Sequence, residues 1–390
     1  MTVGTVPASV FDADLPTLAY GAEETPAEVY PRLQATQRQA PVALGPFGPE
    51  VLSYHLVRAV LRDPRFQIPP GINLLAQGVS SGPLWDKVTN SLLCLEGDEH
   101  HRLRSLASKA FTPRATLRLH DTMVDVMNGL VDQVAHAGRC DVVTDLARPY
   151  PVPIICALLG APREDWQRFS LWADDVFKAF SFTVDLAEIE PVVMRAWREL
   201  DDYVDDMVAR RRHNLTDDLL SDFIRAEDDG DRLNAAELRM LAGGLLLAGT
   251  DTTRNQVAAS VQVLRAHPQQ WELLRAQPEL AMSAVEETMR HSPIACGTLR
   301  LVVEDAELDG YTLPAGTTVL VNTAAANRDP AVYDDPDRVD ITRGGHEIAE
   351  ALNVLATRLA NPRIAGPVPW KPMVGLSGPK SLPIEFDTRR

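Results

Sequence analysis

The residues whose types and spacing most suggest chemistry are Ala248-Gly249-Thr250-Asp251-Thr252-Thr253. They lie in an apolar stretch with helical spacing, where a glycine costs about 1 kcal/mol relative to alanine. A threonine there can donate back to a carbonyl and bend the helix, and a carboxylate is costly unless it is paired or used. One interpretation is a widened groove for a small ligand, with Asp251 and Thr252 as an acid–alcohol pair that relays protons. The alternative is an ordinary helix whose polar residues face a polar neighbour.

Two other charged pairs are spaced to lie on one face of a helix. Glu287 and Arg290 are three positions apart, and His100 and Arg104 are four apart, so the members of each pair are neighbours on a helix surface. By itself the first pair is typical of a surface salt bridge. The second brings two potential cations together, which an anion bound between them would explain; the alternative is a solvated pair without a ligand.

The element that must position residues 248–253 is a long helix. Asn234 is suited to cap its N-terminus, and Glu237 follows three residues later, as in a capping box. Nothing interrupts the helical pattern until His267-Pro268, so the predicted helix spans about 235–267. Because it is apolar on most sides in its middle, it must cross the protein interior.

The other elements are also mainly helical. Apolar residues within 117–134 recur at helical spacing, whereas strand patterns are short. Residues 311–322 predict a hairpin, YTL and TTVLVN, with its turn at Pro-Ala-Gly, and residues 300–308 could pair nearby. We find no repeat and no low-complexity linker. The expected fold class is mainly α with a minor β-sheet, in a single domain over residues 1–390.

The composition excludes several classes of protein. The 390 residues include 38 Lys and Arg and 54 Asp and Glu, which gives a net charge of −16 and no basic cluster for nucleic-acid phosphates. Cys94, Cys140, Cys156 and Cys296 lie far apart, as expected for a reducing compartment. The apolar stretch 240–249 is too short to span a membrane. We expect a cytoplasmic protein without a membrane span or a nucleic-acid partner.

Taken in order, the motifs resemble the cytochrome P-450 family of haem-thiolate monooxygenases. EGDEHHRLRSLASKAFTPR (96–114) is similar to the family's haem-contacting helix, AGTDTT (248–253) to its oxygen-activation motif, and EETMR (286–290) contains its Glu-x-x-Arg. VRAVLRDPRF (57–66), Arg300 ahead of a short strand, and ANRDP with DDPDR (326–338) also match. The resemblance covers about residues 25–387. It implies the cytochrome P-450 fold, a soluble bacterial type of protein and a haem cofactor.

The resemblance also implies roles for the matching residues. Haem propionates are buried carboxylates that need cationic donors, and the implied donors are His100, Arg104 and Arg300. Asp251 and Thr252 are the implied catalytic residues, which deliver protons to iron-bound dioxygen, and Ala248 and Gly249 border the oxygen and substrate cavity. The remaining implied residues are a structural ion-pair triad, Glu287, Arg290 and Arg338, and a substrate-pocket segment, Ile294, Ala295 and Cys296.

One part of the family pattern is missing. The family binds its iron through a Cys thiolate, which favours O–O cleavage, in a Phe-Gly-rich loop followed by a helix. Here Arg343 is followed by Gly344-Gly345-His346 and then directly by 347–359, which look like the later part of that helix, and no cysteine follows Cys296. We therefore expect the ligand loop to be deleted between about 343 and 347, which leaves no axial Cys for the metal. His346 is the only nearby candidate; its alternative is a junction residue without a ligand role.

Three interpretations of function stay open. The first is a shortened form of a monooxygenase that inserts one oxygen atom from O₂ into a lipophilic small molecule, with electrons from a ferredoxin or flavodoxin-type donor. As written, such a chain is not catalytically competent, and its haem binding is in question. The second is a haem-free partner or activator, for example of a glycosyltransferase. The third is a non-functional remnant or a His-ligated haem protein. The Phe-, Trp- and Val-rich segment 169–198 should roof a lipophilic pocket.

Overall fold

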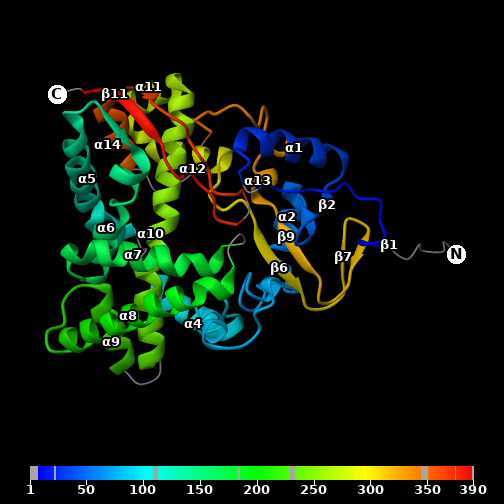
Figure 1. Cartoon of the computed structure of the whole chain (residues 1–390), viewed down its shortest axis with the longest axis horizontal. Coiled ribbons are helices and arrows are strands. Elements are labelled where there is room, and N and C mark those ends of the chain that lie inside the picture. Colours follow the sequence, from blue (N-terminus) through cyan, green and yellow to red (C-terminus); the bar gives the residue numbers. More distant parts are fainter. Residues whose placement is uncertain are drawn as a thin grey trace.

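A computed structural model describes residues 8–21, 23–108, 113–181, 185–228, 233–343, 350–373 and 375–388. As the sequence predicts, helices dominate, and most strands gather on one side of the molecule (Figure 1). The α-helices are α1 (Pro26–Gln39), α2 (Tyr54–Val60), α3 (Pro83–Thr89), α4 (Gly97–Ser108), α5 (Pro113–Ala135), α6 (Pro151–Leu159), α7 (Trp166–Phe177), α8 (Leu186–Arg212), α9 (Leu219–Asp228), α10 (Ala235–Ala266), α11 (Pro268–Ala276), α12 (Ala281–His291), α13 (Thr323–Ala326) and α14 (Glu350–Arg358).

The strands of the described residues form three small sheets. The first has the order β2 (Val42–Gly45), β3 (Gly48–Val51), β9 (Thr318–Val321), β6 (Thr298–Val302) and β4 (Phe66–Gln67). The second has the order β1 (Ala8–Ser9), β8 (Tyr311–Leu313) and β7 (Ala306–Leu308), and the third β10 (Leu359–Ile364), β11 (Pro383–Thr388) and β5 (Arg139–Asp141).

The predicted hairpin over residues 311–322 is wrong in its pairing. β8 pairs with β7, and β9 pairs with β6 and β3, so the two predicted arms belong to different sheets. The turn between them explains the difference. Gly316 has a positive φ of 88° and donates from its backbone N–H to the carbonyl oxygen of Val302, which directs the following strand onto β6.

The long helix predicted over about 235–267 is present as α10, with 32 residues. Asn234 Oδ1 accepts from the N–H of Glu237 at 2.9 Å, and the Glu237 carboxylate accepts from the N–H of Asn234 at 2.8 Å. These two bonds are the predicted capping box. Figure 1 shows α10 passing through the helical half of the molecule, from near α11 at one end to near α8 and α9 at the other.

Two clusters of buried apolar side chains share α10. The α8 core contains side chains of α3, α4, α6, α7, α8 and α9 and of residues 238–247 of α10. The α14 core contains side chains of α5, α11, α12, α14 and β11 and of residues 257–264 of α10. Residues 248–253 therefore lie between the two cores.

One segment of the described chain, Val142–Leu159, is long and apolar enough by composition to cross a membrane. In the structure it comprises the π-helical turn η3 (Val142–Ala147) and α6, and both pack against α10. Its apolar side chains contribute to the two cores. Packing inside the protein thus accounts for its composition.

Candidate functional site

Ala248 and Thr252 form an open face in the middle of α10. Ala248 is exposed, and Thr252, one turn later, donates from its hydroxyl to the Ala248 carbonyl oxygen at 2.8 Å. Thr250 is buried and donates to the Leu246 carbonyl oxygen at 2.8 Å. Such back-bonded hydroxyls bend helices. The open side of this segment is the place where the sequence analysis expects a ligand groove.

Gly249 serves a different contact from the one predicted. A Cβ at this position would collide with the side chain of Ile155 on α6. The glycine thus allows α6 and α10 to approach closely. The side of α10 on which Gly249 lies therefore faces α6, whereas Ala248 and Thr252 lie on the open face.

Asp251 is only 3% exposed and is held by three side chains. Arg254 Nε donates to its Oδ1 at 2.8 Å, Asn255 Nδ2 to its Oδ2 at 3.0 Å, and Lys371 Nζ lies 3.3 Å from Oδ1. Burial lowers the pKa of Lys371, and the negative charge of Asp251 opposes this effect. Successive residues of a helix point about 100° apart, and Thr252 is bonded elsewhere. The structure does not bring the acid and the alcohol into contact.

The cluster around Asp251 extends to other elements. Arg254 also pairs with Asp174 of α7, which in turn pairs with Arg148. The sequence analysis missed these partners. Arg254 lies three residues after Asp251, a spacing that could have revealed it, whereas Lys371 and Asp174 come from distant segments without any local motif.

The predicted anion-binding cations form no ion pair with an acidic side chain in the described part of the chain. Arg300 of β6 is partly buried, and its guanidinium donates to Thr298 Oγ1 at 3.0 Å and to the Leu299 carbonyl oxygen at 2.7 Å. Burial lowers the pKa of Arg300, and the negative charge of Glu96 opposes this effect. On α4, Arg104 is exposed and His100 is partly exposed. A partly buried guanidinium without an ion-pair partner is suited to an anionic ligand.

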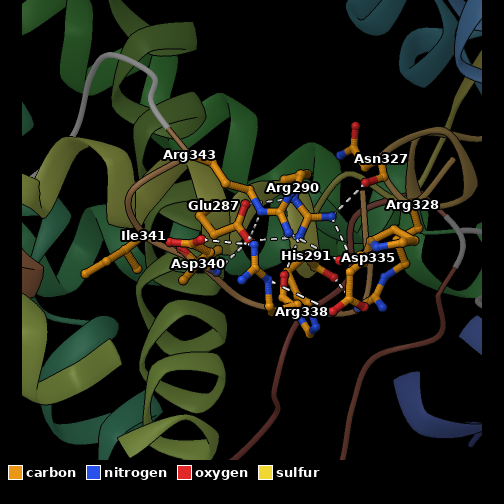
Figure 2. A network of polar contacts seen from close by, with 12 residues as sticks. Glu287, Arg290, His291, Asn327, Arg328, Asp335, Arg338, Asp340, Ile341 and Arg343 are labelled. Atoms are coloured by element: carbon orange, nitrogen blue, oxygen red, sulfur yellow. Dashed lines mark hydrogen bonds and ion pairs between the residues drawn. The ribbon is translucent and has the colours of Figure 1, made fainter. Parts of the chain in front are cut away.

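Glu287 and Arg290 form a buried ion pair on α12 (Figure 2). Arg290 donates from Nε and Nη2 to the two carboxylate oxygens of Glu287 at 2.7 and 2.9 Å. It also donates to the carbonyl oxygens of Asn327, Pro336 and Arg338. The pair therefore fastens α12 to the irregular segment that follows α13.

The structure corrects the third member of this ion-pair triad. The side chain of Arg338 is 58% exposed and pairs with Asp340 at 3.3 Å, while only its backbone carbonyl faces Arg290. The Nε of Arg343 instead lies 3.5 Å from Glu287 Oε1 (Figure 2). Arg343, the last described residue before the junction, takes the place predicted for Arg338.

A cavity of about 660 Å³ lies between α3, α4, α7, α8 and the first half of α10. The segment predicted to roof a pocket contributes Val176, Phe177, Phe180, Met194 and Trp197 to its wall. Ala248 also lines it, so the open face of α10 and the cavity are continuous. Pockets of this size and apolar character hold drug-sized ligands.

The three residues predicted to line a substrate pocket do not line this cavity. Ile294 is buried against Ala259 and Trp370, and Cys296 is buried in a separate cluster near α1. Ala295 is exposed. Their role in a substrate pocket therefore stays a prediction, which this cavity does not support.

The described residues include suitable partners for the propionates of the haem that the resemblance implies, but no suitable ligand for its iron. Arg300, Arg104 and His100 suit the propionates, and the face of Ala248 and Thr252 suits the oxygen side. Burial raises the pKa of Cys140, Cys156 and Cys296 to about 12, which favours the thiol over the thiolate. Burial also raises the pKa of Cys94. His346 lies outside the described residues, within which no cluster of His, Cys, Asp and Glu could hold a metal.

Known proteins with similar sequences are monooxygenases. A family model described as "Cytochrome P450" matches residues 85–277 and 274–344. Mycinamicin IV hydroxylase/epoxidase from Micromonospora griseorubida is 38% identical over 384 residues, 91% of this chain and 94% of that protein. Luteothin monooxygenase from Streptomyces thioluteus is 33% identical over 383 residues, 91% of this chain and 92% of that protein.

Solved structures agree with the sequence relatives. The crystal structure of CalO2 superposes with a TM-score of 0.83 at 30% identity and covers 94% of this chain and 99% of that chain. A structure of P450BioI in complex with a ligated acyl carrier protein gives a TM-score of 0.82 at 27% identity, with 92% and 97% covered.

Proposed function

Because this chain belongs to the cytochrome P450 family, we propose that it has the architecture of a haem monooxygenase for a lipophilic small molecule, without the thiolate. In a complete form, haem supplies the oxygen activation and a ferredoxin or flavodoxin-type donor supplies electrons. The 390-residue chain does not complete this reaction.

The main support for the absence of a thiolate ligand is the position of the cysteines in the sequence. No cysteine follows Cys296, whereas a family ligand loop would follow Arg343. The match to the family model ends at residue 344, where the expected deletion begins. Buried thiols with raised pKa values, at Cys140, Cys156 and Cys296, are poor iron ligands.

The substrate class is supported by the cavity. Its wall carries Phe177, Phe180 and Trp197, and it reaches α10 at Ala248. In this proposal Thr252 holds its hydroxyl proton on the open face of α10, and Asp251 is held in position on the adjacent face by Arg254, Asn255 and Lys371. Retention of this face favours a monooxygenase ancestry over a haem-free partner protein.

The first test is the reduced carbon monoxide difference spectrum of the exact 390-residue chain after haem is supplied. We expect no thiolate-type band. A stoichiometric haem with such a band contradicts the proposal, because it requires that one of the four cysteines reaches the iron.

A second variant tests the same point by gain of function. Residues 344–346 are replaced by the ligand loop and following helical turns of the mycinamicin IV hydroxylase/epoxidase. We expect the thiolate band to appear in this chimera, and to disappear again when the introduced Cys is changed to Ser.

A further inference from the structure

We propose that this chain binds a neutral lipophilic molecule in its 660 Å³ cavity in the complete absence of haem. The class of ligand rests on the proposed function, but the independence from the cofactor goes beyond it. The chain would then act as a binding protein without the cofactor.

The walls of the cavity come from one continuous part of the chain. Among the described residues, all that line it lie between Pro83 and Ala248. Neither Arg343 nor a described residue of α14, which flank the expected deletion, is part of this wall.

The α8 core, which packs around the cavity, comes from nearly the same range of residues as the cavity wall. All buried residues of the α8 core lie between Leu74 and Leu247. Arg343 and α14, which flank the junction, contact α12 and the α14 core instead. The packing that shapes the cavity is therefore separate from the packing that the deletion affects.

Ion pairs between elements hold the walls together. Lys87 of α3 pairs with Asp201 of α8, and Arg239 of α10 pairs with Asp205 of α8 at 2.6 Å. Arg102 of α4 pairs with Glu237 of α10. These contacts join all the walls except α7, which packs directly on α8 and α10.

The same ion pairs determine the charge of the ligand. Lys87, Asp201, Glu237 and Arg239 line the cavity, but each is neutralised by a partner of opposite charge. The other charged lining residues, Asp86 and Glu99, are exposed and solvated. The interior wall is apolar, so transfer of an uncharged apolar molecule from water is favourable.

The test uses the full chain purified without haem and the neutral fluorescent probe N-phenyl-1-naphthylamine. We expect saturable binding to one site, with quenching of tryptophan emission, since Trp197 lines the cavity. Addition of haem should leave the dissociation constant unchanged within about twofold.

A matched pair of variants locates the probe. Gly244 lines the cavity and a Cβ there meets no atom within 4 Å, so Gly244→Phe should fill the space. We expect it to weaken probe binding by about tenfold or more, which corresponds to ~1.4 kcal/mol. Gly129→Phe, on α5 in a separate groove and equally free of nearby atoms, should leave binding unchanged.

Several outcomes overturn the proposal. These are equal weakening by both variants, no weakening by Gly244→Phe, binding that requires haem, or a chain whose circular dichroism shows that it does not fold without haem. A thiolate band in the carbon monoxide experiment would end the proposed function but leave this inference standing, because the probe titration contains no haem.

Discussion

The α8 core and the α14 core use the two halves of one helix for different purposes. In the α8 core, α10 forms a wall of a 660 Å³ cavity. In the α14 core, the other half of α10 packs among α5, α12 and α14, and the buried Trp271 of α11 donates to the Leu359 carbonyl oxygen at 3.2 Å. One core leaves room for a ligand, and the other holds together the segments on both sides of the expected deletion.

This comparison shows why a deletion at the junction can be tolerated by the fold. Arg343 is anchored on Glu287 immediately before the junction, and α14 is buried immediately after it. Residues 248–253 lie between the two cores, so the position of Asp251 and Thr252 depends on the packing of both.

The largest expected loss of stability comes from removing the buried Glu287–Arg290 ion pair of α12. Glu287→Ala leaves the guanidinium of Arg290 buried without its carboxylate, which costs about 3–5 kcal/mol of the free energy of unfolding. Chemical denaturation checks this. The control is Glu286→Ala, at the adjacent, partly exposed position, which should change stability by no more than about 0.5 kcal/mol. Similar losses in both variants would remove the special role of the buried pair.

The next effect compares one substitution in the two cores. Leu355 of α14 is fully buried among other side chains, whereas Leu200 of α8 is buried but lines the cavity. We expect Leu355→Ala to cost about 4 kcal/mol and Leu200→Ala about 2 kcal/mol, because a side chain at a cavity wall has fewer packing contacts to lose than one enclosed on all sides. Urea unfolding of both variants measures the difference. Equal costs would mean that the cavity is not part of the α8 core's packing.

The smallest effect concerns the ion pair between α3 and α8. Lys87→Met removes a partly exposed pair, so stability should fall by no more than about 1 kcal/mol. Because this pair connects two walls of the cavity, we expect the probe to dissociate several-fold faster in stopped-flow measurements. Lys178→Met is the control, since Lys178 pairs with Asp175 three residues away on the same stretch of chain and, among the described residues, does not line the cavity. An unchanged dissociation rate in Lys87→Met would show that this pair does not restrain the opening.

The sequence was sufficient for the features that depend on local spacing. The capping box at Asn234, the length of α10 and the Glu287–Arg290 pair were predicted correctly, because each depends on residues within one helix. The order of motifs along the chain was also sufficient for the family. The lipophilic pocket wall between residues 169 and 198 followed from its composition.

The features that failed depend on contacts between distant segments. Arg343 rather than Arg338 reaches Glu287, because the irregular chain after α13 turns the side chain of Arg338 to solvent. Lys371, 120 residues after Asp251, takes part in binding its carboxylate. No local sequence pattern predicts either contact, because each joins residues that are far apart in the chain.

By itself, the amino-acid sequence determined the family, the central helix with its polar motif, and the absence of a cysteine after residue 296. These follow from residue type and short-range spacing. Only the tertiary structure decided that Asp251 and Thr252 bond to different partners, that Gly249 serves the contact with α6, and that the cavity and the junction belong to different cores. Such facts depend on which elements meet in space, which is settled by side-chain packing across the whole chain.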